Sequence, residues 1–171
     1  MNARTLSLLS AVSVCLVVAW CAFAGPMLPK RNLPDDHLSV SGLSQFTIEA
    51  FPTQQVMDRY AVSDEKLASV FRERLEQKGF RVHHDGNHPR LRLTVFDAQD
   101  TDQPDAVALT AVISVYQKVF MDRLDRQMTL PTITFGMTSL TTKDNVADTL
   151  KQLIWDTSDA LAGTVHTASK Q

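Results

Sequence analysis

Apolar and polar residues alternate most regularly between Ala106 and Tyr116, and this period of two is typical of a β-strand. The odd-numbered positions are all apolar, whereas the even-numbered positions mix small, polar and aromatic side chains. A strand that is covered on only one side has this pattern. We therefore predict a central strand whose buried face carries Val107, Leu109, Ala111, Ile113 and Val115.

Apolar residues at helical spacing follow Ser63 and predict an amphipathic helix that ends before Gly79. The Ser63 hydroxyl suits an N-cap, and Asp64 and Glu65 favour the positive end of a helix. Gly79 supplies the left-handed residue that commonly follows a helix. The stripe comprises Leu67, Val70, Phe71 and Leu75.

The longest apolar stripe lies near the C-terminus and predicts a second helix of about six turns. Thr142 is the predicted cap, and Asp144 lies in the first turn. A stripe of this length needs an apolar partner, and the apolar face of the sheet is the natural one. Its members are Val146, Leu150, Leu153, Ile154, Thr157, Leu161 and Val165.

A first strand is predicted within Leu38–Ala50, with a bend at Gly42 and an end at Pro52. Its best part places Phe46, Ile48 and Ala50 on one face.

Residues 80–105 predict two strands and two connections. Phe80–His83 and Leu91–Val95 read as strands. Between them, His84–Pro89 contains Asp-Gly and Pro, which favour a turn. Asp97–Asp105 reads as a polar, acidic loop.

The polar run Asp122–Arg126 separates the central strand from another apolar run, Met128–Met137. We predict a hairpin here because strand-forming residues dominate both sides of the polar run. Pro131 cannot donate to a ladder, so the second strand should lie at an edge or contain a bulge. The alternative is a short helix, since Phe120, Leu124 and Met128 are spaced by four.

These elements predict an α+β fold, built as a two-layer sandwich. The sheet is expected to be mostly antiparallel, with about four to five strands and with both helices on one face. Residues 38–171 form the single predicted domain, because the chain has the size of one ordinary core.

The N-terminus has the three parts of a secretory signal peptide. Met1–Arg4 is basic, Thr5–Trp20 is largely apolar, and Ala22-Phe23-Ala24 offers small residues for cleavage after Ala24. We therefore assign residues 1–24 to a signal peptide and residues 25–37, which contain three prolines, to a tether. The expected location is periplasmic or secreted.

Two alternatives for this segment stay open. Cys21 could be the acylated residue of a lipoprotein, although Trp20 stands where a small side chain is preferred. Leu6–Phe23 could also remain as an uncleaved membrane anchor. Membrane contact is expected only in these two cases. Both cysteines, Cys15 and Cys21, lie in this segment, so the exported domain has no thiol for a disulfide or a metal.

Charge argues against a nucleic-acid partner. The chain has 17 basic residues, and without Arg4 of the signal peptide 16 remain against 19 acidic ones. A protein that binds nucleic acid needs clustered Lys and Arg to displace counterions from phosphates, and no such cluster occurs.

Only one cluster of residues suits a metal. It comprises His83, His84, Asp85, Asn87 and His88, and imidazole and carboxylate groups bind zinc, copper or nickel. We favour a solvated turn, because Gly86 and Pro89 prevent a helix that would align the histidines. No metal site is assigned.

Motifs for catalysis or cofactor binding are missing. The sequence has no Gly-x-Ser-x-Gly pentad, no Gly-x-x-x-x-Gly-Lys and no Gly-x-Gly-x-x-Gly. Trp155 could stack on a ligand, but its neighbours Leu153 and Ile154 favour a place in or beside the core. No catalytic residue and no cofactor are assigned.

The second face of the predicted sheet is the candidate interface. If both helices cover the first face, this one meets water or a partner, and it mixes aromatic, aliphatic and basic side chains as many interfaces do. The alternative is an ordinary solvated sheet. The candidate residues are Arg92, Thr94, Phe96, Thr110, Val112, Ser114, Tyr116 and Lys118.

The leader, the tether and the order of elements are together similar to small exported proteins of the bacterial envelope, including lipopolysaccharide-assembly and transporter-accessory lipoproteins. The resemblance covers Leu38–Val165 and is one of topology, carried chiefly by Ser63–Val82, Leu91–Val95 and Asp144–Val165. It implies a non-enzymatic accessory or interaction protein with an envelope protein as partner. A module that binds a small ligand or lipid, and an enzyme of unrecognised class, are the alternatives.

Overall fold

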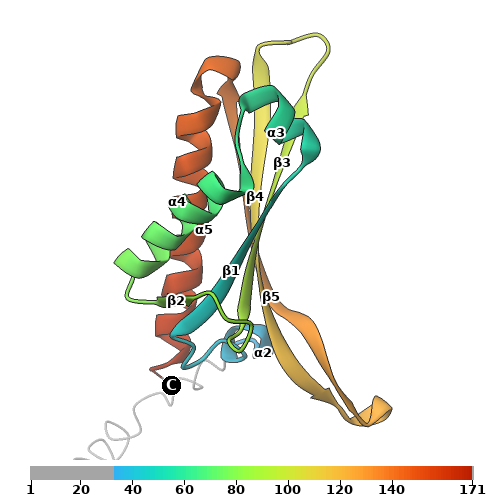
Figure 1. Ribbon diagram of the computed structural model, residues 1–171, viewed down its shortest axis with the longest axis vertical. Helices are drawn as coiled ribbons and strands as arrows, with labels where there is room; N and C mark the ends of the chain where they lie inside the picture. The colour runs from blue at the N-terminus through green and yellow to red at the C-terminus, as the bar shows by residue number, and fades with distance from the viewer. Residues whose placement is uncertain (1–32, 171) are drawn as a thin grey trace, which may run out of the picture. The chain divides into compact units, whose positions relative to one another are not determined.

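The computed structural model describes residues 33–170, so the signal peptide expected over residues 1–24 and most of the tether lie outside the described residues. The described part contains one five-stranded sheet with the strand order β2-β1-β3-β4-β5 (Figure 1). The strands are β1 (Gln45–Pro52), β2 (Arg81–His83), β3 (Arg90–Gln99), β4 (Ala106–Met121) and β5 (Arg126–Thr142). The helices are α2 (Asp35–Leu38), α3 (Gln54–Tyr60), α4 (Asp64–Gln77) and α5 (Val146–Ala168).

The sheet is mixed, and most of its paired residues lie in antiparallel pairs. β3, β4 and β5 follow one another as antiparallel neighbours. β1 runs parallel to both of its neighbours, β2 and β3. The chain returns from β1 to β2 through α3 and α4, and such a helical crossover brings the next strand back in the same direction. The predicted α+β class is confirmed.

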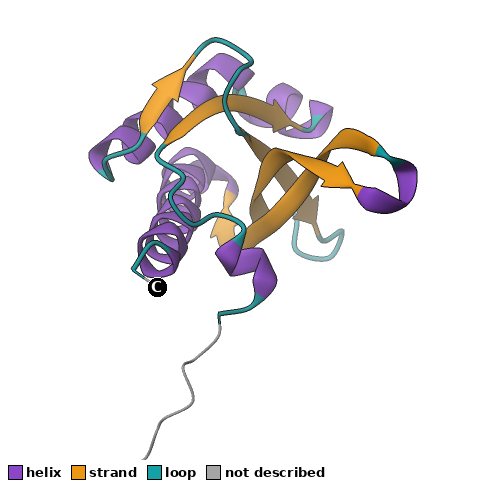
Figure 2. Ribbon diagram, turned by 90° about the horizontal axis from the view of Figure 1, so that it is seen from below, coloured by secondary structure: helices purple, strands orange, loops and turns teal. Residues whose placement is uncertain are grey.

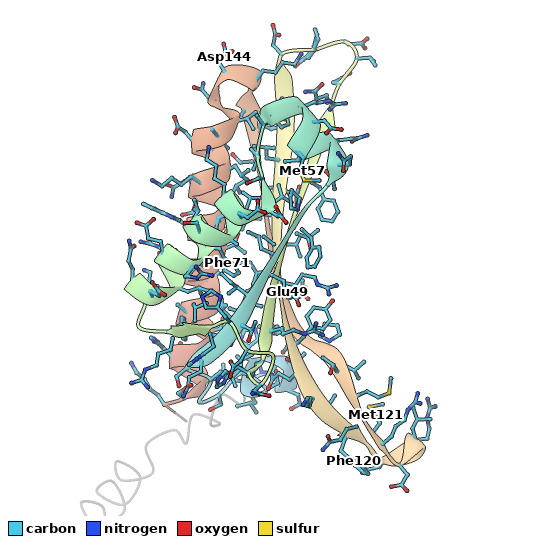
Figure 3. The ribbon with its side chains drawn as sticks, in the orientation of Figure 1. Glu49, Met57, Phe71, Phe120, Met121 and Asp144 are labelled. Carbon is cyan, nitrogen blue, oxygen red and sulfur yellow. The ribbon has the colours of Figure 1, made fainter. Side chains whose placement is uncertain are left out.

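Both long helices lie on one face of the sheet, as the two apolar stripes predicted (Figure 1). α4 contacts β1, and α5 contacts β4 and β5. Figure 2, viewed from below, shows α5 nearly end-on beside the sheet. In Figure 3, Phe71 lies on the helix side of the sheet, where it is fully buried. The sheet contributes the five odd-numbered residues of β4 that the alternation predicted, Val107, Leu109, Ala111, Ile113 and Val115, each with 0% exposure.

The predicted ends of α4 are confirmed, whereas the predicted cap of α5 is wrong. The Ser63 hydroxyl accepts a hydrogen bond from the Lys66 amide at 3.2 Å, and Gly79 follows α4 with φ of +89°. At α5, Lys143–Asn145 form a 3-10 turn, so the α-helix begins only at Val146. The Thr142 hydroxyl accepts from the Asn145 side chain at 3.1 Å instead of capping the helix.

Two short helices were not predicted. α3 is capped by the Thr53 side chain and has one fully buried residue, Val56, so it has no apolar stripe that periodicity could show. α2 is a single turn after Pro34 and includes residues that the sequence analysis placed in the tether. Shortly after α2, Val40 is buried in the core.

The predicted hairpin between β4 and β5 is confirmed, and its turn is the 3-10 segment Asp122–Leu124. β5 is the edge strand, and its pairing shifts register next to Pro131, as the missing amide of proline requires. Beyond Tyr116, β4 pairs only with β5, and this two-stranded ribbon extends past the first residue of β3, Arg90. Figure 3 shows Phe120 and Met121 near its end.

An ion-pair cluster joins the two long helices on their solvent side. Asp159 of α5 accepts two hydrogen bonds from the Arg74 guanidinium of α4, at 2.8 and 2.7 Å, and lies 2.9 Å from Lys78 Nζ. The hydrogen bonds from Arg74 are the largest cause of a lowered pKa at Asp159, and Lys78 adds to it. Arg74 also lies over the ring of Trp155, 4.8 Å from its centroid.

We expect Asp159→Asn to destabilise the protein at pH 7 by about 1 kcal/mol, because the pair is partly exposed to solvent. Asp159 has a lower pKa in the folded than in the unfolded chain, so its contribution is present above the ordinary Asp pKa and is lost as pH falls through the folded value. Urea unfolding of both proteins from pH 7 down to pH 3 measures this. A difference that stays constant as pH falls would contradict it.

Candidate functional site

The sheet face opposite α4 and α5 is the candidate site, and we call it the open face. Alternation places on it Glu49 and Phe51 of β1, Arg90 of β3 and all eight residues predicted from sequence. Phe51 and Phe96 are 47% and 44% exposed. Most of the other side chains are partly exposed, and Lys118 is exposed. The prediction that Arg92, Thr94, Phe96, Thr110, Val112, Ser114 and Tyr116 share one face therefore agrees with the register of β3 and β4. Lys118 follows Tyr116 at the same period of two, in the part of β4 that pairs only with β5.

Arg92 is the centre of the open face. Its guanidinium carbon lies 4.7 Å from the ring centroid of Phe51 and 4.9 Å from that of Tyr116. Both rings therefore attract the cation through their negative faces. Glu49 pairs with Arg92 at 3.5 Å and with Arg90 at 3.2 Å. These contacts hold Arg92 in one place. Because one carboxylate, Glu49, faces two arginines, the open face carries more basic than acidic charge.

Hydroxyl pairs order the β5 side of the open face. Thr110 and Thr138 share a hydrogen bond of 2.9 Å across the β4–β5 ladder, and Ser114 and Thr134 share one of 3.0 Å. Cross-strand pairs of this kind stabilise an antiparallel sheet. Next to them Leu140 is 79% exposed. This side of the face is polar with one apolar residue at its margin.

The aromatic side of the open face borders a depression. Its volume is about 580 Å³, and it lies where the connection between β2 and β3 approaches β4. Four cationic or potentially cationic side chains and one acid line it together with an aromatic ring: Arg90, Lys118, His84, His88, Glu49 and Tyr116.

The contribution of β1 to the open face was not predicted from the sequence. Glu49 alternates with Ile48 and Ala50, so the sequence predicts the face of the strand on which it lies. The sequence does not predict which side chains of other strands lie beside it. β1 lies between β2 and β3, and this order depends on pairing between distant segments. Glu49 therefore meets Arg90 and Arg92 through topology alone.

The structure brings together three of the five residues in the histidine-rich turn. Ligand atoms of His83, Asp85 and His88 all lie within 4.8 Å of one another, whereas His84 is outside this group. Asn87 donates a hydrogen bond from its side chain to Asp85 at 3.3 Å. These contacts place the cluster at the crossover from β2 to β3.

Other candidates from the sequence have structural places. Trp155 lies at the margin of the core, where Arg74 and Lys151 each approach its ring to 4.8 Å. Ser41 donates a hydrogen bond to the carbonyl of Ala168 at 3.1 Å and so ties the start of the domain to the end of α5. Within residues 33–170, no helix is both long and apolar enough to span a membrane.

No protein family matches the sequence, and no curated protein does either. Solved structures with a similar fold include a minor lipoprotein from Acinetobacter baumannii, with 14% identity, 73% of this chain and 92% of that chain covered, and a TM-score of 0.41. Rare lipoprotein B from Shewanella oneidensis has 11% identity, 72% and 96% coverage, and a TM-score of 0.38. An uncharacterized lipoprotein B from Nitrosomonas europaea has 8% identity, 71% and 81% coverage, and a TM-score of 0.38.

These neighbours are bacterial lipoproteins, so the resemblance to envelope lipoproteins is confirmed at the level of topology. Their TM-scores lie below 0.5, and the likeness transfers no residue and no activity to this chain.

Proposed function

We propose that the protein is a non-enzymatic accessory protein of the bacterial cell envelope and that it binds an envelope protein through the open face. The observation that carries this proposal is Arg92, which lies between Phe51 and Tyr116 on a sheet face that neither long helix covers. Arginine and aromatic residues are the side chains most enriched at the energetic centres of interfaces. The export signal read in residues 1–24 supports the envelope location.

The side chains of the open face are already ordered in the free protein, and this favours binding by this face. Arg92 contacts two rings and pairs with Glu49, so less side-chain entropy remains to be lost when a partner arrives. The hydroxyl pairs between β4 and β5 fix the neighbouring surface in the same way. A preorganised face of this kind loses less affinity to ordering than a mobile one.

Charge indicates the chemistry of the partner. Arg90, Arg92 and Lys118 outnumber the single acid, Glu49. We therefore expect the partner surface to carry carboxylates around an apolar centre that fits Phe51 and Phe96.

The alternative of a lipid- or small-ligand-binding module requires an apolar pocket. The apolar groove between α4 and α5 has a volume of about 190 Å³. Pockets for small molecules commonly measure roughly 300–1,000 Å³. The groove is small for this purpose, so the open face supports the proposed function better.

Crosslinking from a single position tests the proposal. A photoreactive residue in place of Thr94, on the open face, is expected to capture one envelope protein in living cells. The matched position is Glu76, which is exposed on the outer side of α4. Capture from both positions alike, or capture of lipid alone from position 94, would contradict the proposed interface.

Substitutions on the open face should then weaken the complex that crosslinking detects. Phe96→Ser together with Tyr116→Ser is expected to reduce the crosslink by at least about tenfold, because an interface aromatic commonly contributes more than 1 kcal/mol. Leu124→Ser is the matched control, since Leu124 is 43% exposed and lies in the hairpin turn outside the open face. Circular dichroism checks that all variants fold. Equal crosslinking by the double variant and the control would overturn the proposal.

A further inference from the structure

We propose that His83, Asp85 and His88 form a binding site for a divalent transition-metal ion, with Zn²⁺ as the ion of choice. The sequence predicted a solvated turn because no helix could align the histidines. In the structure the histidines come together without a helix, because the chain crosses β1 on its way from β2 to β3. None of these three residues is one of the open-face residues that carry the proposed function, although His88 also lines the depression that borders the open face.

Thr47 explains why the three side chains converge. It lies in β1 opposite His83 of β2 and Arg90 of β3, so the connection from β2 to β3 must cross the sheet directly above it. Its hydroxyl donates to the Asp85 carbonyl at 2.6 Å, and its amide donates to the Pro89 carbonyl at 2.9 Å. One residue of β1 therefore fixes both ends of the connection and holds it against β1.

The ligand atoms are near metal-binding distances. They lie within 4.8 Å of one another, and His88 Nε2 is 3.6 Å from Asp85 Oδ1. Bonds of about 2.0–2.2 Å to a tetrahedral Zn²⁺ place ligand atoms about 3.4 Å apart. Closing these separations requires shifts of about 1 Å in the ligand atoms, together with a turn of the His88 ring. Imidazole nitrogens and a carboxylate oxygen are ordinary zinc ligands, and three protein ligands leave a fourth position for water.

His83 provides a second, independent indication. Its Nε2 atom is buried and has no hydrogen-bond partner within the described part of the chain. An unpartnered buried nitrogen costs free energy, and a metal bond would remove this cost. The rings of His83 and His88 are stacked, with centroids 4.1 Å apart and planes at 26°. Binding therefore requires the partly exposed His88 ring to turn so that both nitrogens face the ion.

Asp85 is already oriented for this role. Its Oδ2 atom accepts a hydrogen bond from the Asn87 side chain, which leaves Oδ1 on the side of His88. Such contacts behind a ligand are typical of metal sites, because they fix the direction of the ligand lone pair. The Asp85 side chain is 53% exposed, so an ion can enter from solvent.

Titration of the full-length protein with ZnCl₂ tests the site. We expect one ion bound per chain by calorimetry, and a thermal midpoint raised by about 5–10 °C at a free concentration a hundred times the dissociation constant. Chelation by EDTA should reverse the shift, and MgCl₂ should produce none, because Mg²⁺ prefers oxygen ligands. An unchanged midpoint with Zn²⁺ would mean that the turn is merely solvated.

Matched histidine variants make the test specific. His88→Gln should lose at least about tenfold in zinc affinity, because it removes one of three ligands. His84→Gln should bind like the unchanged protein, because His84 is adjacent in sequence but outside the cluster. Both variants should fold and melt alike without metal. Equal binding by His88→Gln and the unchanged protein, or equal loss in the two variants, would overturn the proposal. Both results are read from zinc binding and melting, so they test the metal site independently of partner binding by the open face.

Discussion

Replacing Ile113 by Ala is expected to lower the free energy of unfolding by about 2–5 kcal/mol. Ile113 lies in the middle of β4 and has no exposed surface. It pairs with Leu93 of β3 on one side and with Phe135 of β5 on the other, beneath the helix layer. Its truncation would leave a cavity that β-strands on both sides prevent from closing, and the cost of a core truncation rises with the volume of the remaining cavity.

The neighbouring residue provides the control. Val112→Ala removes methyl groups from the same strand, but Val112 points to the open face and is partly exposed. We expect it to cost less than about 1 kcal/mol. Equilibrium unfolding in urea, with equal slopes for all three proteins, gives the comparison. Similar losses for the two variants would mean that both faces of the sheet are covered, and the open face would have to be abandoned.

The apolar pattern within a single strand or helix was sufficient to predict the parts of the fold that depend on burial alone. The alternation in β4 predicted which side of the sheet is buried, because a strand exposes successive residues to opposite faces. The stripe on α5 predicted its contact with that side, because apolar surface of this extent must be covered. The eight candidate residues of the open face followed from the same alternation.

Strand order could not be read from the sequence. β2 and β3 flank β1 and both run parallel to it, and nothing local in His84–Pro89 indicates that this short connection crosses β1. Two features of the sites depend on this crossing. It brings Glu49 between Arg90 and Arg92, and it stacks His83 on His88. Pairing between distant segments determines both features, and no residue pattern within one element carries that information.

Short elements were missed for a different reason. α3 has one fully buried residue, so its hydrophobic pattern is too brief to reveal a helix. Its position depends on a polar contact instead. Arg59 Nη1 lies 2.8 Å from Asp97 Oδ2, and the Tyr60 hydroxyl donates to the same oxygen at 3.3 Å. Asp97, which the sequence pattern assigns to a loop, instead extends β3 on the helix side of the sheet.

The Arg59–Asp97 pair leads to the second large effect that we expect. The Asp97 side chain is 0% exposed, whereas that of Arg59 is 43% exposed. Arg59→Ala would therefore leave a buried carboxylate without its cation, at a cost of about 3 kcal/mol. Asp97→Ala would leave an arginine that water can still solvate, and we expect it to cost only about 1–2 kcal/mol. Urea unfolding of both variants measures the difference.

A double variant measures the interaction energy between Arg59 and Asp97 separately from the other effects of removing each side chain. Once Asp97 is Ala, no buried charge remains to be neutralised, so adding Arg59→Ala should cost less than about 0.5 kcal/mol. The single Arg59→Ala variant should thus be less stable than the double variant, because the second substitution removes the unpaired carboxylate. If the double variant loses as much free energy of unfolding as the two single variants together, Asp97 is already solvated in the folded protein. In that case the docking of α3 on β3 would depend on the apolar contacts of Val56 and on the hydrogen bond that Gln99 donates to the Tyr60 hydroxyl at 2.8 Å.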